Sequence, residues 1–138
     1  MPATLKLEIV TPEAVVYSQD VEMVTLPGIE GEMGVFPQHV PVMTQLVAGE
    51  IAVRKDGQDT YLAVGEGFVE VTPDHVSVLT DMAVPADQID EAKAEEARKR
   101  AEARLSENVD EEEAVRLHAA VAHSAAMIAV KRRRRGAH

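Results

Sequence analysis

The sequence predicts an all-β sandwich of about ten short antiparallel strands over residues 1–85, followed by an antiparallel two-helix hairpin with a basic tail over residues 86–138. In the first part, apolar and polar residues alternate, which places one face of each strand in the core. Turn residues separate these runs at intervals of about 8–12 residues, as in sandwiches and barrels. After Pro85, glycine and proline disappear until Gly136, and Ala, Glu, Arg and Lys dominate.

Five runs show the alternation most clearly, and we expect each of them to form a strand: 5–9, 21–25, 51–54, 69–72 and 75–78. In the second run, Val21, Met23 and Thr25 are expected to face inward. Turn residues lie at 11–13, 48–49, 55–58, 65–67 and 72–74. Lys55-Asp56-Gly57-Gln58 is the clearest hairpin turn. No alternation of strands with helices is present, so a parallel sheet is not expected.

The segment LPGIEGEMGVFPQHVPV, residues 26–42, is dense in glycine and proline. Glycine admits backbone angles closed to other residues, and proline fixes φ and lacks an N–H donor. We therefore predict tight turns here, rather than a central strand, with a short apolar run at 33–36 between them. Glu30, Glu32 and His39 are the polar candidates for function, because rigid surface loops commonly carry binding residues.

Two helices are predicted in the second part. Asp87 is a suitable N-cap for the first helix, with Asp90 and Glu91 in its first turn, and the helix continues to Leu105. The positions on its apolar face are Ile89, Ala92, Ala97, Ala101 and Leu105. Asp110 caps a second helix after a turn at 106–110. Its apolar positions include Ala114, Leu117, Val121, Ala125 and Ile128.

The seam between these helices is rich in alanine, which lets helices approach closely but buries little apolar surface. At about 25 cal/mol per Å², each alanine contributes far less than a buried leucine. We therefore expect the hairpin to be marginal by itself, loosely docked on the sandwich and able to move. The alternative is a permanently docked hairpin that only covers the sheet.

Composition excludes several classes of function. Without cysteine there is no disulfide, thiolate metal site or cysteine nucleophile. His39 and His75 lack a metal-ligating partner, and Gly65-Glu66-Gly67 lacks the third glycine and following helix of a dinucleotide loop. We therefore predict a non-enzymatic protein with no catalytic residue, no metal and an aliphatic core. No apolar run approaches the roughly 18 residues of a membrane span, and no secretory signal is recognised at the N-terminus.

Charge is unevenly distributed. Residues 1–85 hold 13 acids and 3 bases, whereas residues 86–138 hold 11 of each. Five consecutive bases, Lys131, Arg132, Arg133, Arg134 and Arg135, close the second helix. An acidic body argues against nucleic-acid binding, and a basic tip suits an acidic partner. The alternative for this run is a solvated, frayed tail.

The spacing of Pro27-Gly28, Gly31, Gly34-Val35, Pro37, His39, Pro41 and Gly49 resembles the epsilon subunit of the bacterial F-type rotary ATP synthase, over residues 5 to about 130. The alternative is a Gly/Pro-rich loop of an ordinary β-domain. The resemblance implies a non-catalytic central-stalk subunit, present once per complex, that couples proton translocation to ATP synthesis. Its sandwich would contact gamma and the ring of membrane proteolipid subunits, with Glu30, Glu32 and His39 toward the ring. The implied location is peripheral, on the cytoplasmic face of the bacterial inner membrane.

The resemblance also implies that the hairpin can extend beside gamma and oppose ATP hydrolysis, with the bases at 131–135 meeting acidic residues of the beta subunit. Some members of the family bind ATP at the start of the first helix, where this chain has Ile89-Asp90-Glu91-Ala92-Lys93-Ala94. Lys93 replaces an arginine of that motif, and Arg100 matches a second basic position.

On the second helix, His123 and Met127 stand where nucleotide-binding members have arginine. Lysine is a point charge rather than a planar fork. We therefore expect weak or absent ATP binding, and no other cofactor. The alternative function is a stand-alone nucleotide-responsive binding module.

Overall fold

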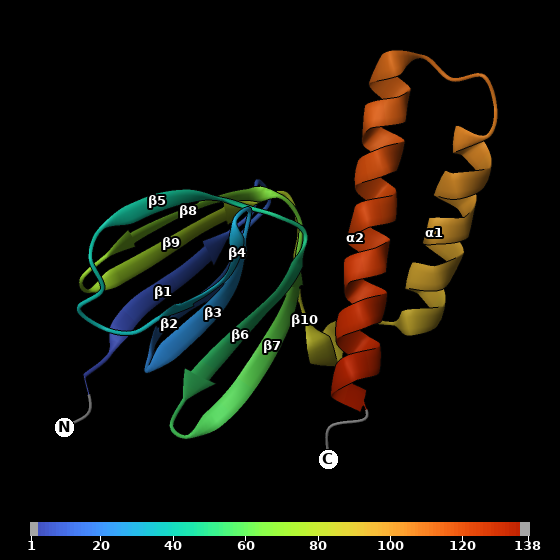
Figure 1. Ribbon diagram of the computed structural model, residues 1–138. Helices are drawn as coiled ribbons and strands as arrows, with labels where there is room; N and C mark the ends of the chain where they lie inside the picture. The colour runs from blue at the N-terminus through green and yellow to red at the C-terminus, as the bar shows by residue number, and fades with distance from the viewer. Residues whose placement is uncertain (1–2, 136–138) are drawn as a thin grey trace.

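The computed structural model describes residues 3–135 and consists of a β-sandwich with a two-helix hairpin beside it (Figure 1). The strands are β1 (Leu5–Val10), β2 (Val15–Val21), β3 (Met23–Gly28), β4 (Gly31–Val35), β5 (Val42–Leu46), β6 (Gly49–Lys55), β7 (Gln58–Val64), β8 (Gly67–Thr72), β9 (His75–Thr80) and β10 (Ala83–Pro85). A 3₁₀ turn, η1 (Ala86–Gln88), leads into α1 (Glu91–Leu105) and α2 (Glu111–Arg135). The predicted fold class is confirmed.

The strands follow the order β10-β7-β6-β3-β5-β8-β9-β1-β2, with β4 added beside β3. The path bends where β3 meets β5 through a single pair, Gly28 and Leu46. Strands before and after this bend contribute to one common core: Ile51 and Leu62 lie in the same buried cluster as Leu7 and Val78. The sheet therefore closes on itself as two layers around aliphatic side chains.

Hairpins between consecutive strands account for four of the strand pairings: β1–β2, β3–β4, β6–β7 and β8–β9. The turn at Asp56-Gly57 has positive φ at both residues, 54° and 74°, as a two-residue hairpin turn requires. One pair of neighbours is different, since β1 and β9 run parallel, with Leu7 opposite Val76. The expectation of antiparallel strands throughout is wrong here. Strands β2 to β8 lie between β1 and β9 in the chain. Because no hairpin turn connects β1 to β9, no turn fixes their relative direction.

The predicted inward faces are confirmed for β1, β6, β8 and β9, whose alternating apolar residues are buried. The prediction for 21–25 is wrong, because the run is not one strand. β2 ends at Val21 and β3 begins at Met23. The break at Glu22 changes the phase of the alternation, so Val24 and Leu26 are buried while Met23 and Thr25 are half-buried.

The prediction of tight turns over residues 26–42 is also wrong in part. Residues up to Gly28 belong to β3, and 31–35 form β4, with one turn between them. Pro27 is tolerated because β3 changes its neighbour there, from β6 at Thr25 to β5 at Gly28. The Pro27 carbonyl still accepts a hydrogen bond from the Val47 N–H at 2.9 Å.

The first helix begins later than predicted. Asp87 lies in η1, and Asp90 is the N-cap of α1, where its side chain accepts a hydrogen bond from the Lys93 N–H at 3.1 Å. Of the predicted apolar face, Ile89 and Ala101 are buried, whereas Ala92 is exposed; Ala94, which is not among the predicted positions, is also buried. The cap of α2 is confirmed: the Glu113 N–H donates to Asp110 Oδ1 at 2.8 Å.

The buried positions of α2 agree only in part with those predicted. Ile128 is buried as expected, but Ala125 is exposed, and Ser124, Ala126 and Val130 are buried as well. The reason is that α2 contacts α1 and also β6 and β7, so its buried surface is wider than one apolar stripe. Neither helix within residues 3–135 is long and apolar enough to cross a membrane.

We predict that Leu7→Ala lowers the free energy of unfolding by about 2–5 kcal/mol, because Leu7 is fully buried and its removal leaves a cavity. Leu79→Ala is the matched control, since Leu79 lies on the nearby strand β9 with 58% of its surface exposed. It should cost less than about 1 kcal/mol. Urea denaturation of both variants measures the difference, and equal losses would contradict the assignment of inward and outward faces.

Candidate functional site

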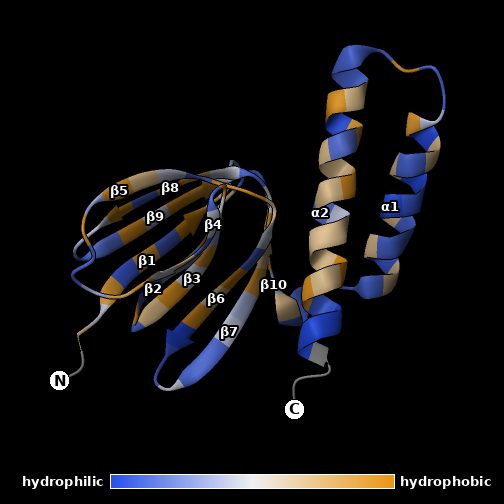
Figure 2. Cartoon of the chain, viewed as in Figure 1, coloured by the Kyte–Doolittle hydropathy of each residue, from blue (hydrophilic) through white to orange (hydrophobic). Residues whose placement is uncertain are grey.

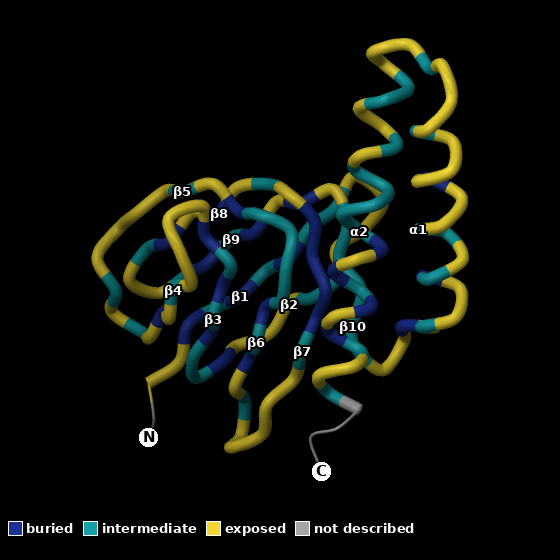
Figure 3. Tube along the Cα trace, turned by 45° about the vertical axis from the view of Figure 1, so that its right-hand side comes forward, coloured by how far each residue is buried: buried dark blue, intermediate teal, exposed yellow. Residues whose placement is uncertain are grey.

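The hairpin is docked on the sandwich through the C-terminal half of α2. Ala63 of β7 packs with Ala126, Val130 and Ile89 in a small apolar cluster that is separate from the main core. The end of the hairpin that carries the 106–110 turn projects beyond the sandwich and is largely exposed (Figures 1 and 3). Figure 2 shows that α1 is mostly hydrophilic. The contact that holds the hairpin is therefore limited to the C-terminal half of α2 and contains only a few apolar side chains.

Two arginines near the end of α2 bind one carboxylate on β6. Arg134 Nε lies 3.0 Å from Glu50 Oε2, its terminal nitrogen bonds Oε1, and Arg133 donates to Oε1 at 3.2 Å. The Glu50 side chain is only 13% exposed. The Arg134 guanidinium also stacks over the Tyr61 ring, 3.6 Å from its centroid. The hydrogen bond with Glu50 raises the pKa of Arg134 above its usual value, so the guanidinium stays charged.

A second polar contact lies ten residues earlier on the same helix. His123 Nε2 is 3.0 Å from Asp81 Oδ1, beside the strand corner at Gly65. A Cβ atom at Gly65 would come within 2.0 Å of that oxygen and 2.8 Å of the imidazole nitrogen. Glycine at this position therefore provides the space in which the contact forms.

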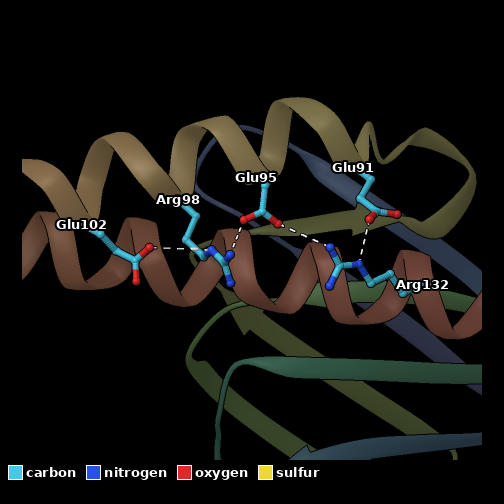
Figure 4. A network of polar contacts seen from close by, with 5 residues as sticks. All are labelled: Glu91, Glu95, Arg98, Glu102 and Arg132. Atoms are coloured by element: carbon cyan, nitrogen blue, oxygen red, sulfur yellow. Dashed lines mark hydrogen bonds and ion pairs between the residues drawn. The ribbon is translucent and has the colours of Figure 1, made fainter.

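Ion pairs form within α1 and between α1 and α2 (Figure 4). Arg132 of α2 bonds Glu91 at 2.7 Å and Glu95 at 3.5 Å on α1, and the hydrogen bond with Glu91 raises the pKa of Arg132. Arg98 pairs with Glu95 and, at 3.7 Å, with Glu102. The two contacts of Arg132 join α2 to α1, whereas the pairs made by Arg98 lie within α1.

The predicted basic tip is thus occupied within its own chain. Lys131 donates to the Ala86 carbonyl at 3.2 Å, and the side chains of 132–134 each bind glutamate. Residues 131–134 belong to α2 and have partners within the chain, although the Arg132 and Arg133 side chains are 57% and 58% exposed; the Arg135 side chain lies outside the described residues. Sequence reasoning missed Glu50 and Tyr61, because no local pattern distinguishes these strand residues. The charge contrast between body and tip was the available signal.

Glu30, Glu32 and His39 do not lie in one turn. Glu30 and Glu32 are exposed at the β3–β4 hairpin, while His39 lies in the 36–41 loop at the opposite end of β4. His39 Nδ1 is 2.7 Å from the Val40 carbonyl oxygen. Glu32 instead lines a groove of about 360 Å³ that it shares with Glu50 and Arg133. The glutamate end of β4 therefore adjoins the docked end of α2.

The residues predicted for nucleotide binding are spread over surface and interior. Ile89 and Ala94 are buried, Asp90 caps α1, and Lys93 is exposed. Arg100 pairs with Glu96 at 3.2 Å. His123 and Met127 contact the sandwich, through Asp81 and the apolar cluster respectively. Among the residues that the structure describes, no three His, Asp or Glu side chains are grouped to hold a metal ion.

The outer face of β5, β8 and β9 is unusually apolar. Met43, Phe68 and Leu79 are 69%, 59% and 58% exposed. Together with Val10 of β1 they line a hollow of about 440 Å³. Exposed large hydrophobic side chains that cluster on one face commonly mark an interaction surface. The sandwich therefore presents a candidate docking face on the side of the sheet away from its core.

Comparison with known proteins identifies relatives over nearly the whole chain. Residues 4–86 match the family model described as ATP synthase, Delta/Epsilon chain, beta-sandwich domain. The ATP synthase epsilon chain of Herpetosiphon aurantiacus is 40% identical over 95% of this chain and 96% of its own length. That of Bacillus subtilis is 44% identical over 78% of this chain and 82% of its own.

Solved structures agree with these sequence matches. A chain in the Euglena gracilis mitochondrial ATP synthase, described as OSCP/F1/c-ring, superposes with a TM-score of 0.75 and 27% identity over 94% of this chain and 82% of that one. A chain of the Tetrahymena thermophila central stalk and c-ring, 11% identical, shares the fold with a TM-score of 0.53 over 62% of this chain and 69% of its own. The chain thus belongs to the ATP synthase epsilon chain family.

Proposed function

We propose that this protein is a non-catalytic rotor subunit that couples proton translocation to ATP synthesis. In this role one copy per complex lies on the cytoplasmic face of the inner membrane and contacts gamma and the ring of proteolipid subunits. The observation that carries the proposal is the combination of a rigid, fully buried aliphatic core with an exposed apolar outer face. A rotor component must transmit force without deforming, and must hold its neighbours by a surface that water would otherwise cover.

The apolar face at Met43, Phe68 and Leu79 is the proposed contact with gamma, because a permanent partner within a complex would bury it. The β3–β4 hairpin with Glu30 and Glu32 is the proposed contact with the ring. His39 lies at the other end of β4, so it serves a contact separate from that of the glutamates. These assignments place the two partners on different surfaces of the sandwich.

The hairpin is the proposed regulator of ATP hydrolysis. Its apolar contact with the sandwich is small, and the remaining contacts are ion pairs that an acidic partner can replace. When released, the arm extends beside gamma and presents its bases to the beta subunit. In that position it opposes rotation in the direction of hydrolysis.

We predict that deleting residues 86–138 raises ATP hydrolysis by the assembled enzyme, because the arm that obstructs rotation is gone. Assembly should be preserved, since the main core cluster lies within the sandwich. Hydrolysis by purified complexes measures the effect, with gamma content as the control for assembly. Unchanged hydrolysis in fully assembled complexes would remove the inhibitory role.

We predict that Glu32→Ala combined with His39→Ala weakens coupling without lowering stability, because both positions are on the surface or half-buried. Proton pumping per ATP hydrolysed in membrane vesicles should fall, while the free energy of unfolding of the isolated chain changes by less than about 0.5 kcal/mol. The two single variants separate the contributions from opposite ends of β4. A parallel loss of stability would mean that these side chains are structural.

We predict weak or absent ATP binding by the isolated chain, which separates a rotor subunit from a nucleotide-responsive module. Lys93 cannot form the bidentate contact of arginine, and Arg100 already pairs with Glu96. Calorimetric titration with ATP should show no saturation below the millimolar range. A dissociation constant in the low micromolar range would refute this expectation.

A further inference from the structure

We infer that Glu50, with Tyr61 beside it, is the receptor for the arginine end of α2 and the latch that controls release of the arm. This inference rests on the proposed function of the arm as a regulator. It assigns to the sandwich a specific binding site for Arg133 and Arg134, on two strands that are neighbours in the sheet. The same guanidinium groups are the ones that an acidic partner would bind.

The arrangement of Arg133 and Arg134 around Glu50 has the geometry of a specific binding site rather than of a single exposed ion pair. Arg134 engages both oxygens of Glu50, through Nε and a terminal nitrogen, while Arg133 reaches one of them. A planar guanidinium matches a carboxylate in this fork, which a lysine cannot reproduce. The Tyr61 ring, 3.6 Å from the guanidinium carbon, adds a cation–π contact on the flat face of the same group.

Release of the arm leaves a largely shielded carboxylate without its partners at this site. With a side chain 13% exposed, Glu50 would keep a partly buried negative charge without its two partners. The His123–Asp81 contact is more open, with side chains 24% and 48% exposed, so water can replace it more readily. The apolar cluster beside these contacts buries Ile89 and Val130 together with Ala63 and Ala126, so it adds a contribution that does not depend on charge.

It follows that docking and partner binding exclude one another. While Glu50 holds Arg133 and Arg134, these arginines cannot meet another carboxylate. A partner that draws the arm away must therefore offer closely spaced acidic side chains that compete with Glu50 directly. Weakening the latch should favour the extended, inhibitory arrangement, which is the opposite of deleting the arm.

Hydrogen exchange of the full chain tests the latch without the rest of the complex. We expect Glu50→Gln to accelerate exchange of the amides in residues 126–134 by roughly tenfold, because a neutral amide holds arginine less tightly than a carboxylate does. The core amides of β1 and β9 should keep their protection. Glu96→Gln is the matched control, since it removes an exposed ion pair within α1 that does not touch the sandwich.

Arg134→Lys tests the same contact by changing a residue of α2, so that the strands of the sandwich remain unaltered. It keeps the charge but loses the fork and the stacking, so it should also accelerate exchange of residues 126–134. Unchanged exchange in both Glu50→Gln and Arg134→Lys would overturn the inference, as would an equal acceleration in Glu96→Gln.

The assembled enzyme distinguishes the latch from the function on which it rests. If exchange of residues 126–134 accelerates and ATP hydrolysis falls in Glu50→Gln complexes, the latch and the inhibitory role of the arm are both supported. If exchange accelerates but removal of the arm leaves hydrolysis unchanged, the latch stands and the inhibitory role fails. If exchange is unchanged while removal of the arm raises hydrolysis, the inhibitory role stands without this latch.

Discussion

Burial of inward-facing aliphatic side chains between the two sheet layers is the constraint on which the rest of the molecule depends. Leu7, Ile9, Ile51 and Leu62 are fully shielded from water. Interiors of this kind are packed as densely as organic crystals and resist deformation. The β3–β4 turn, the outer apolar face and the Glu50 site all lie on strands of the sandwich. They are therefore fixed relative to one another by its packed core.

The arm is held on a different physical basis. Its contact with the sandwich combines a small apolar cluster with polar contacts at either end, at His123 and at Arg134. Hydrophobic burial changes little with salt, whereas partly exposed ion pairs are screened by it. The two parts of the chain therefore differ in what loosens them: salt should weaken the contact of the arm with the sandwich more than it weakens the packing of the sandwich core.

Local features were predictable from sequence, and features set by distant neighbours were not. The turn at Asp56-Gly57 and the cap at Asp110 depend on a few adjacent residues, and both were predicted. The phase of β3 was missed because one residue, Glu22, breaks a run that looks continuous. Glu50 was missed because its role depends on arginines more than eighty residues later in the chain.

The parallel pairing of β1 with β9 has a consequence for biosynthesis. During synthesis β1 finds one of its two neighbours, β2, soon after it is made, but the other, β9, only after Thr80 has been made. During that interval its apolar face has no complete layer to cover it, and contacts so distant in sequence form slowly. The nascent chain is therefore most exposed to misassociation just before the helical segment is translated.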